Sequence, residues 1–380
     1  MTSGSSSYKI TKGLGNPPGF QRAAKRIPST RKEKPLNHTI YDIAKAANVS
    51  IATVSRVFNE SGSVREATKK RVMKIADEMG YHPQVFAQAL ASKRKNIIAV
   101  VVPIMSNYFF MEILAGVQDK LFETGYELNI INIQSTHDQF DQIEHLIRRQ
   151  RADGYIFISI HLPQSKWHEL DRYDVPMSII DDYSPAHDGV SVNNMEGAYK
   201  ATSYLIEQGC EHVAMISALE SSTPIVDRVD GYRKALLDHG RPFRQELIFT
   251  GDISYRDGFT EKGGFEAMET LLSYEPRPDA CFCASDVQAI GALKSMTQRN
   301  CRIPIISYDN LAVSEYIGLS TIRQPMYEMG AESTRYLLRR IDNPDIEIEH
   351  TTYEPELIIR RSSDMPGTQK PIQIDQKAPI

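Results

Sequence analysis

The residues best suited to chemistry lie between positions 50 and 59, on one side of a short predicted helix. The outward positions of that helix are Ile51, Ala52, Ser55 and Arg56, beside Ser50 and Thr53. Small polar and apolar side chains can contact base edges and thymine methyl groups, and an arginine can hold guanine through two hydrogen bonds. A solvated helix face normally carries several Glu and Lys, and this one carries neither. The face is typical of a helix that enters a DNA groove.

Residues 39–59 predict two short helices joined by a tight turn, which position this face. Thr39 and Asp42 have the spacing of a capping box for the first helix, and Ser50 is the expected N-cap of the second. The inward positions at helical spacing are Ile43, Ala44 and Ala47, then Val54, Val57 and Phe58.

A third helix and a short hinge follow. Ser63 and Glu66 have the spacing of a second capping box, and Gly80 is expected to end the helix. Its predicted inward residues are Val72, Ile75, Ala76 and Met79. After Tyr81-His82-Pro83, a QVFAQALAS stretch with Phe86 and Leu90 on one ridge predicts a helix of two turns, too short to be stable alone.

This order of helix-turn-helix, third helix, Tyr-x-Pro and Ala/Leu-rich hinge resembles the LacI/GalR family of bacterial transcription regulators, from Thr39 to about Arg361. The resemblance implies a regulator, expected to be a repressor, that binds a double-stranded, pseudo-palindromic operator as a homodimer or tetramer. It also implies a small-molecule effector, expected to be a carbohydrate. The expected DNA contacts are Thr39, Tyr41, Ser50, Ile51, Ala52, Thr53, Ser55, Arg56 and Asn59, with Ala87 and Leu90 of the hinge.

The charge distribution supports a DNA-binding head. Residues 1–95 carry 18 Lys and Arg against 6 Asp and Glu, whereas the rest of the chain carries 26 against 42. Such a division indicates a polyanion-binding segment on an acidic body. Residues 1–37 are rich in Ser, Gly, Pro and basic side chains, so we expect a disordered extension that either adds phosphate contacts or has no role.

From residue 96 onward, apolar runs alternate with helical patterns. Strands are predicted at 97–103, 127–133, 154–160, 177–181, 212–217, near 247–249, 280–285 and 303–309. Helices are predicted at about 109–124, 138–150, 196–208, 227–239, 258–272 and 286–298, with a further helical stretch before the strand at 177–181. This order predicts an α/β fold with two doubly wound parallel sheets. The expected domains are a DNA-binding domain at 38–82, a hinge at 83–95, and an effector-binding and dimerisation domain at 96–362 before a disordered tail at 363–380. Lobe one is expected over 96–195 and 322–342, and lobe two over 196–321 and 343–362.

Ligands of such folds bind beyond the carboxyl ends of strands. The residues that the resemblance assigns to an effector site are Phe109, Ser159, Asp181, Arg228, Ser285 and Asp309. Phe109 fits an aromatic wall or the core of its helix equally well, and a Ser at a strand end such as Ser159 is often structural. Asp286 is expected to cap the following helix. Ser285 stands where the family usually has Asn, and Ser307 where Gly is typical.

Other classes of protein receive little support from the sequence. It has no Ser-His-Asp order, no metal-ligand spacing and no phosphate-binding Gly-rich loop next to a strand, so we expect no enzyme activity, metal or cofactor. The four cysteines are expected to be reduced core residues, with redox sensing as the alternative. Cys281 and Cys283 are expected on one face of a strand. No run of 18 apolar residues and no secretory leader is present, so we expect a cytoplasmic, nucleoid-associated protein without a membrane segment. The alternatives are a small-molecule binding protein with a vestigial head and a sugar-processing enzyme, such as an isomerase, on the same fold.

Overall fold

The computed structural model describes residues 38–58, 63–81, 94–103, 108–122, 124–133, 138–219, 222–253 and 258–365. The chain divides into two compact units, Met1–Gln84 and Val85–Ile380. Within the described residues, no helix is long and apolar enough to cross a bilayer.

The first unit contains three helices, α1 (Ile40–Ala47), α2 (Ile51–Phe58) and α3 (Glu66–Glu78). The predicted inward residues of all three helices form one apolar cluster, in which Ile43, Val54 and Val72 are fully buried. Asn48 adopts a left-handed conformation with φ 50°, which ends α1 and starts the turn into α2. The predicted capping box at Ser63 is wrong, because α3 begins at Glu66 with Arg65 as its N-cap residue.

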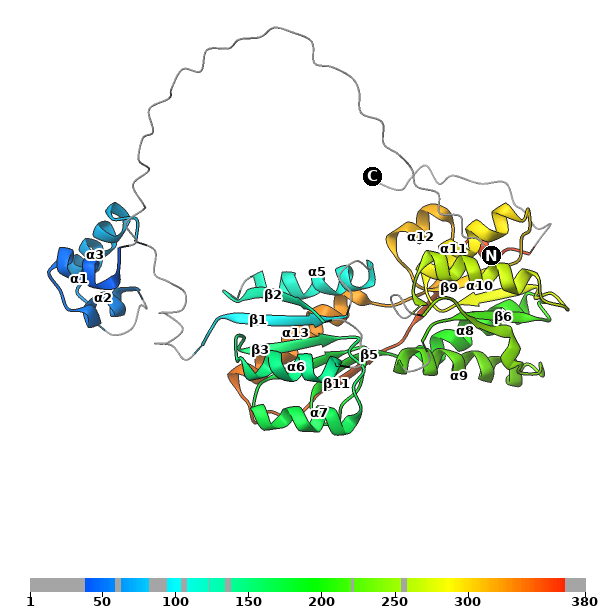
Figure 1. Ribbon diagram of the computed structural model, residues 1–380, viewed down its shortest axis with the longest axis horizontal. Coiled ribbons are helices and arrows are strands. Elements are labelled where there is room, and N and C mark those ends of the chain that lie inside the picture. The colour runs from blue at the N-terminus through cyan, green and yellow to red at the C-terminus, as the bar shows by residue number, and fades with distance from the viewer. Residues whose placement is uncertain are drawn as a thin grey trace, which may run out of the picture. The chain divides into compact units, whose positions relative to one another are not determined.

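The second unit has two lobes, each a six-stranded sheet with helices on both faces (Figure 1). The sheet of lobe one has the order β11-β5-β4-β3-β1-β2, and all of its strand pairs are parallel. Its strands are β1 (Ile97–Val102), β2 (Glu127–Asn132), β3 (Gly154–Ile158), β4 (Met177–Ile180), β5 (Asp188–Val192) and β11 (His350–Tyr353). Helices α5 (Tyr108–Phe122) and α13 (Met326–Asp342) cover one face, and α6 (Gln139–Arg148) and α7 (Gln164–Leu170) cover the other.

The sheet of lobe two has the order β12-β10-β9-β8-β6-β7. Its strands are β6 (Val213–Ser217), β7 (Ile248–Thr250), β8 (Ala280–Cys283), β9 (Ile305–Asp309), β10 (Ser320–Arg323) and β12 (Glu356–Ile358). Helices α8 (Asn194–Glu207) and α9 (Thr223–Asp238) cover one face, α10 (Glu261–Leu272) and α11 (Asp286–Gln298) cover the other, and α12 (Ala312–Ile317) follows β9. Cys281 and Cys283 share one buried face as predicted, with their Sγ atoms 3.9 Å apart.

Several features of the second unit differ from the sequence-based expectation, and strands β5, β10, β11 and β12 were not predicted. Strand β12 pairs with β10 in the antiparallel direction, so the second sheet is not wholly parallel. Residues 343–353 belong to lobe one and not to lobe two, because β11 pairs with β5. The folded part of the chain continues past residue 362, where a disordered tail was expected. Ser363 is 1% exposed, and its hydroxyl forms a hydrogen bond with the hydroxyl of Ser320.

The chain therefore crosses between the lobes three times, at residues 193–194, 324–325 and 354–355. Lobe one is defined here as residues 94–193 and 326–353, and lobe two as residues 194–323 and 356–365. Because three crossovers join the lobes, a change in the angle between them requires all three segments to bend together.

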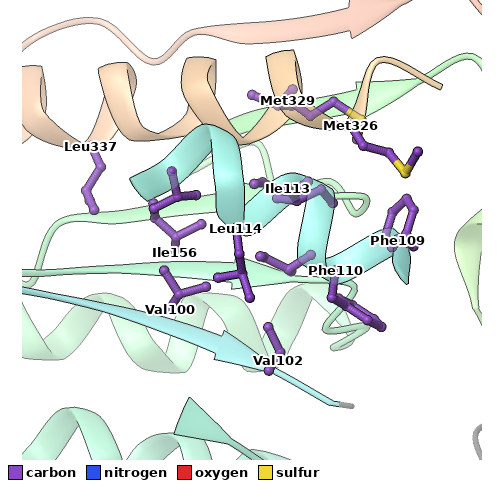
Figure 2. Packing of buried hydrophobic residues seen from close by; sticks show 14 of the residues in the cluster. Val100, Val102, Phe109, Phe110, Ile113, Leu114, Ile156, Met326, Met329 and Leu337 are labelled. Atoms are coloured by element: carbon purple, nitrogen blue, oxygen red, sulfur yellow. The ribbon is translucent and has the colours of Figure 1, made fainter. Parts of the chain in front are cut away.

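Helices α5 and α13 pack closely over the first sheet (Figure 2). A Cβ atom at Gly116 would lie 2.0 Å from the carbonyl oxygen of Tyr327, and one at Gly330 would lie 2.0 Å from that of Ile113. Glycine at both positions lets the two helix backbones approach each other. Phe109, at the start of α5, lies beside Met326, at the start of α13. The beginnings of both helices therefore meet next to a crossover between the lobes.

Candidate DNA-binding surface and effector cleft

The predicted DNA-contacting face of α2 is exposed. Ile51 is 41% exposed, and Ser50, Ala52 and Arg56 are also exposed, whereas Val54 and Val57 point into the core. No acidic residue lies in the first turn of α2, and Arg56 lies in its last turn. This surface offers methyl groups, hydroxyls and one guanidinium, which are the groups that read the major groove.

Local hydrogen bonds cap the N-termini of α1 and α2, the two helices that form this surface. The Oγ of Ser50 accepts from the backbone N–H of Thr53 at 3.1 Å, which confirms Ser50 as the N-cap of α2. In α1, the carboxylate of Asp42 accepts from the backbone N–H and the hydroxyl of Thr39, both at 2.8 Å. Tyr41 is 67% exposed next to Thr39. Ser55 and Thr53 are half-buried, and the predicted contacts Asn59, Ala87 and Leu90 lie outside the described residues.

Other residues of the protein hold the side chain of Arg228 on the side of lobe two that faces lobe one, at a cleft between the two lobes. The guanidinium is 4% exposed; its Nε donates to Asn194 Oδ1 at 2.9 Å and its Nη1 donates to the carbonyl of Ala284 at 2.7 Å. It lies over the ring of Tyr308, 3.8 Å from the centroid. Such contacts fix the plane of the guanidinium while leaving further N–H groups for a ligand.

Asp309 ends β9 and faces the same cleft. Its Oδ1 accepts from Gln324 Nε2 at 2.7 Å, and its side chain is buried. Burial raises the pKa of Asp309 to about 8, against the lowering influence of the Arg228 guanidinium.

Asp181 and Ser159 come from lobe one. Ser159 Oγ donates to Asp181 Oδ2 at 2.7 Å, directly after the ends of β3 and β4. Burial raises the pKa of Asp181, opposed by the nearby His161 and Arg228. The other carboxylate oxygen of Asp181, Oδ1, is buried and has no hydrogen-bond partner in the described part of the chain.

Three of these strand-end residues have left-handed backbone conformations. The φ angles are 50° at Ser159, 66° at Asp181 and 115° at Asp309, none of which is a glycine. Such conformations cost of order 1–3 kcal/mol each and persist where the surrounding structure imposes them. All three residues lie at carboxyl ends of strands on the sides of the two lobes that face each other.

A cavity of about 70 Å³ lies between the lobes at these residues. It is lined by Pro103, Phe109, Phe110, Ser159, Ser222, Pro224, Arg228, Phe259, Ser285, Asp309 and Gln324. Five of the six predicted effector residues therefore line one cavity, and Asp181 contacts it through Ser159. Phe109 lines this cavity and also belongs to the core cluster of lobe one. Larger hollows of about 460 and 280 Å³ are each lined by one lobe, and one of about 320 Å³ at the second crossover is lined by both lobes. None of the three includes a predicted effector residue.

The cavity also includes residues that the sequence did not indicate, above all Gln324 and Phe259. Gln324 follows β10 at the second crossover, and no local pattern distinguishes it. Phe259 precedes the first turn of α10, where an aromatic residue is equally suited to the core. Only the long-range folding of the chain places these two side chains beside Arg228.

The expectation that Asp286 caps α11 is wrong. Ser285 is the N-cap residue, accepting from the backbone N–H of Gln288 at 3.2 Å. Asp286 is fully buried and accepts hydrogen bonds from Ser307, Ser314 and Thr321 side chains and from the Leu311 backbone. The Ser at position 307, where the family typically has Gly, thus donates to a buried carboxylate.

Comparisons with known proteins agree with this architecture. The model of bacterial regulatory proteins of the lacI family matches residues 39–84, and that of periplasmic binding proteins and the sugar binding domain of the LacI family matches residues 95–308. Catabolite control protein A of Priestia megaterium is 32% identical over 82% of this chain and 95% of its own. The HTH-type transcriptional repressor PurR of Aliivibrio fischeri strain MJ11 is 33% identical over 85% of this chain and 98% of its own.

Among solved structures, a complex of the transcriptional regulator CelR with cellobiose is 28% identical, with a TM-score of 0.64 over 86% of this chain and 99% of that one. The two family models together span the helix-turn-helix unit and most of both lobes. The chain therefore belongs to the LacI family of transcription regulators, with an N-terminal DNA-binding unit and a two-lobed domain of the periplasmic-binding-protein type.

Proposed function

We propose that this regulator represses transcription by binding a pseudo-palindromic DNA operator as a homodimer, and that a small-molecule effector held between the lobes controls its operator affinity. The observation that carries the proposal is the exposed face of α2, which presents Ile51, Ala52 and Arg56 without an acidic residue. Ser55 and Thr53 add hydroxyls at the edge of this face. Such a face suits direct contact with base edges, and two copies would contact two half-sites.

Effector binding is proposed at the cavity between the lobes. Phe109 supplies an apolar wall, while Arg228 and Asp309 supply a fixed donor and an acceptor from lobe two. Asp181, Ser159 and Ser285 complete the polar set. A cavity of about 70 Å³ is smaller than the roughly 300–1,000 Å³ of most ligand sites. We infer that the effector binds an arrangement with the lobes further apart and that its binding shifts the balance between arrangements.

The hinge carries the proposed link to DNA. Residues 83–95 connect the helix-turn-helix sequence to β1, and we propose that Ala87 and Leu90 contact the minor groove at the operator centre. An inserted leucine unstacks a base step, and the resulting bend allows further contacts. Pyrimidine–purine steps unstack most readily, so such a step is expected at the operator centre. Because the proposed operator is chromosomal DNA, we propose that the protein is located at the nucleoid in the cytoplasm of a bacterial cell.

Selection of bound duplexes from a random library by the full-length protein tests this function. We expect an inverted repeat to be enriched, with a pyrimidine–purine step at its centre, and a carbohydrate to change the affinity for the selected duplex. Enrichment of no sequence would contradict operator recognition and favour a small-molecule binding protein. Turnover of a pentose or hexose by the same preparation would favour the enzyme alternative.

A further inference from the structure

A hollow of about 280 Å³ in lobe one shares no lining residue with the cavity between the lobes. It is bordered by the edge strand β2, by helix α6 and by the segment 149–152 that leads from α6 to β3. Its volume is just below the roughly 300–1,000 Å³ of most small-molecule sites, and no acidic side chain lines it. The hollow can therefore hold a small molecule, and its lining indicates the charge of that molecule.

The charged side chains at this hollow are all basic. They are Arg149 and Arg151, both exposed, and His145 in the last turn of α6. Among the described residues neither arginine forms an ion pair, although residues 96–380 carry 42 Asp and Glu against 26 Lys and Arg. Basic residues at the end of a helix also complement its dipole, which explains His145 and its neighbour Arg148. A guanidinium can bind a phosphate or carboxylate through two parallel hydrogen bonds, so the two unpaired arginines favour an anion.

The hydroxyl of Tyr155 is a buried donor without an acceptor at the same hollow. Tyr155 lines the hollow and is 0% exposed, and its hydroxyl oxygen has no hydrogen-bond partner in the described part of the chain. Burial raises the pKa of Tyr155, against the lowering influence of the backbone N–H groups of Ala152 and Arg151, so the hydroxyl keeps its proton. Because buried polar atoms are almost always hydrogen-bonded, this hydroxyl requires an acceptor that the described residues do not supply.

Two backbone donors lie beside this hydroxyl. The N–H groups of Arg151 and Ala152 lie near its oxygen but outside hydrogen-bonding geometry, and neither donates to a carbonyl group within the described ranges. The carboxylate of the next residue, Asp153, does not line the hollow; it accepts from the N–H groups of Lys95 and Asn96 at 2.9 and 2.6 Å. Three donors without acceptors therefore lie together, next to two arginines without ion partners.

The rest of the hollow is largely apolar. Ala99, Ile131 and Leu146 line it from β1, β2 and α6. We propose that this hollow binds a small organic anion, whose phosphate or carboxylate accepts hydrogen bonds from the tyrosine hydroxyl and the two arginines and whose apolar body lies against Ile131 and Leu146. The site is separate from the proposed effector cleft and admits a second, negatively charged ligand.

Ligand-observed NMR titration of the full chain tests the charge preference. The anionic probes are 1-naphthyl phosphate and 1-naphthoate, 1-naphthol is their uncharged counterpart, and inorganic phosphate lacks the apolar body. We expect at least one organic anion to bind at least about tenfold more tightly than 1-naphthol and than inorganic phosphate. Equally tight binding of 1-naphthol, or no binding of either organic anion at millimolar concentration, would overturn the proposal.

Hydrogen–deuterium exchange of the full chain locates the bound anion. Residues 151–155 should exchange more slowly when the anion is bound, and so should residues 95–97, whose N–H groups bond to Asp153. Protection confined to the residues of the effector cleft would place the anion there instead and would contradict a separate site.

Substitutions of neighbouring arginines separate a specific contact from general attraction by surface charge. Arg149→Ala and Arg151→Ala should each weaken anion binding at least about fivefold, whereas Arg148→Ala should leave it unchanged. Arg148 is the matched control, since it is exposed in the same part of the chain and does not line the hollow. Equal effects of the three substitutions would overturn the assigned contacts. A changed oligomeric state with unchanged anion binding would assign the hollow to an interface between copies and would likewise overturn the proposal.

Tyr155→Phe keeps the ring and removes only the hydroxyl. This variant should bind the anion at least about fivefold more weakly and should bind 1-naphthol as the wild type does. Urea unfolding of the same variant measures any contribution of the hydroxyl to the fold. Wild-type anion affinity in Tyr155→Phe, whatever its stability, would show that the hydroxyl does not contact the anion.

Discussion

The guanidinium of Arg228 donates through Nε to Oδ1 of Asn194, the first residue of α8, over 2.9 Å. Asn194 also donates to the carbonyl of Val192 at the end of β5. Arg228 is thereby tied to the first crossover between the lobes. Asp309 is tied in the same way to the second crossover, through Gln324. Because both side chains are bonded to segments that must bend when the lobes move, a ligand that contacted them would act directly on the first and second crossovers.

Substitution of Asn194 by Ala is expected to weaken effector binding about tenfold, because Arg228 loses the acceptor that orients it and such a bond is worth about 1.5–3 kcal/mol. Arg228→Ala should abolish the effector response while operator affinity without effector stays unchanged. Titration of effector and operator binding in parallel measures both effects. Asn129→Ala, at an exposed position of β2, is the control. Wild-type effector affinity in Asn194→Ala would show that Asn194 does not position Arg228.

Substitution of Arg56 by Ala is expected to cost roughly 1–3 kcal/mol at the operator and to relax sequence specificity, because a bidentate contact to a guanine would be lost. Lys74→Ala is the matched control, since Lys74 is exposed on α3 in an ion pair with Glu78. Its loss should weaken binding to all duplexes similarly and reduce the salt dependence. Competition assays against random duplex at several salt concentrations distinguish the two effects. Unchanged specificity in Arg56→Ala would contradict the groove assignment of α2.

The pKa of Asp309 predicts a pH-dependent stability. Its folded pKa of about 8 lies above the usual value, so the folded state binds the proton more tightly than the unfolded state. The stabilisation is complete below the unfolded pKa of about 4 and is lost as the pH rises towards 8. Asp309→Asn keeps an acceptor for Gln324 but has no carboxyl proton to lose, so its stability should not fall in this way as the pH rises. We expect the variant to exceed the wild type in unfolding free energy by more than about 1 kcal/mol at pH 8 and by less at pH 5.

Thermal and urea unfolding at the two pH values measure this difference. Asp230→Asn, which removes a half-exposed carboxylate from α9, is the control for the loss of one negative charge. Parallel pH profiles for Asp309→Asn and the wild type would mean that Asp309 titrates normally in the folded protein.

The sequence predicted those parts of the fold whose pattern is local. Continuous apolar runs identify central strands such as β1 and β3, because both faces of these strands are buried. Strands β5, β10, β11 and β12 were not predicted. β11 is short, alternates between exposed and half-buried residues, and pairs with β5, about 160 residues earlier. A strand of this kind is defined by its partner, and the partner depends on how the chain crosses between the lobes.

The residues of the candidate site also fall into those that the sequence predicted and those that it did not. Asp181 and Asp309 were predicted from the family resemblance and from their positions at the carboxyl ends of apolar strands, where ligands of such sheets bind. Gln324 and Asn194 were not, since both lie on crossovers and acquire their partners only when the two lobes are assembled. The role of Asp286 was predicted incorrectly, because its four hydrogen-bond donors come from positions 21 to 35 residues later in the chain.

The hydrogen bonds to the Asp286 carboxylate are expected to stabilise the fold without contributing to effector binding. Its carboxylate is fully buried and accepts from Ser307, Ser314 and Thr321, which belong to β9, α12 and β10. Ser307→Ala removes one donor to a buried charged group, so we expect the free energy of unfolding to fall by about 1.5–3 kcal/mol. Asp286→Ala should cost more, because it leaves three hydroxyls and one backbone N–H without their acceptor.

Urea unfolding at pH 7 measures both changes, and Thr297→Ala, at an exposed position of α11, is the control. Effector affinity should remain unchanged in Ser307→Ala, because neither Ser307 nor Asp286 lines the cavity between the lobes. A Ser307→Ala variant as stable as the wild type would show that the remaining donors satisfy Asp286. A variant of unchanged stability but altered effector affinity would instead place Ser307 in the coupling between α11 and the cleft.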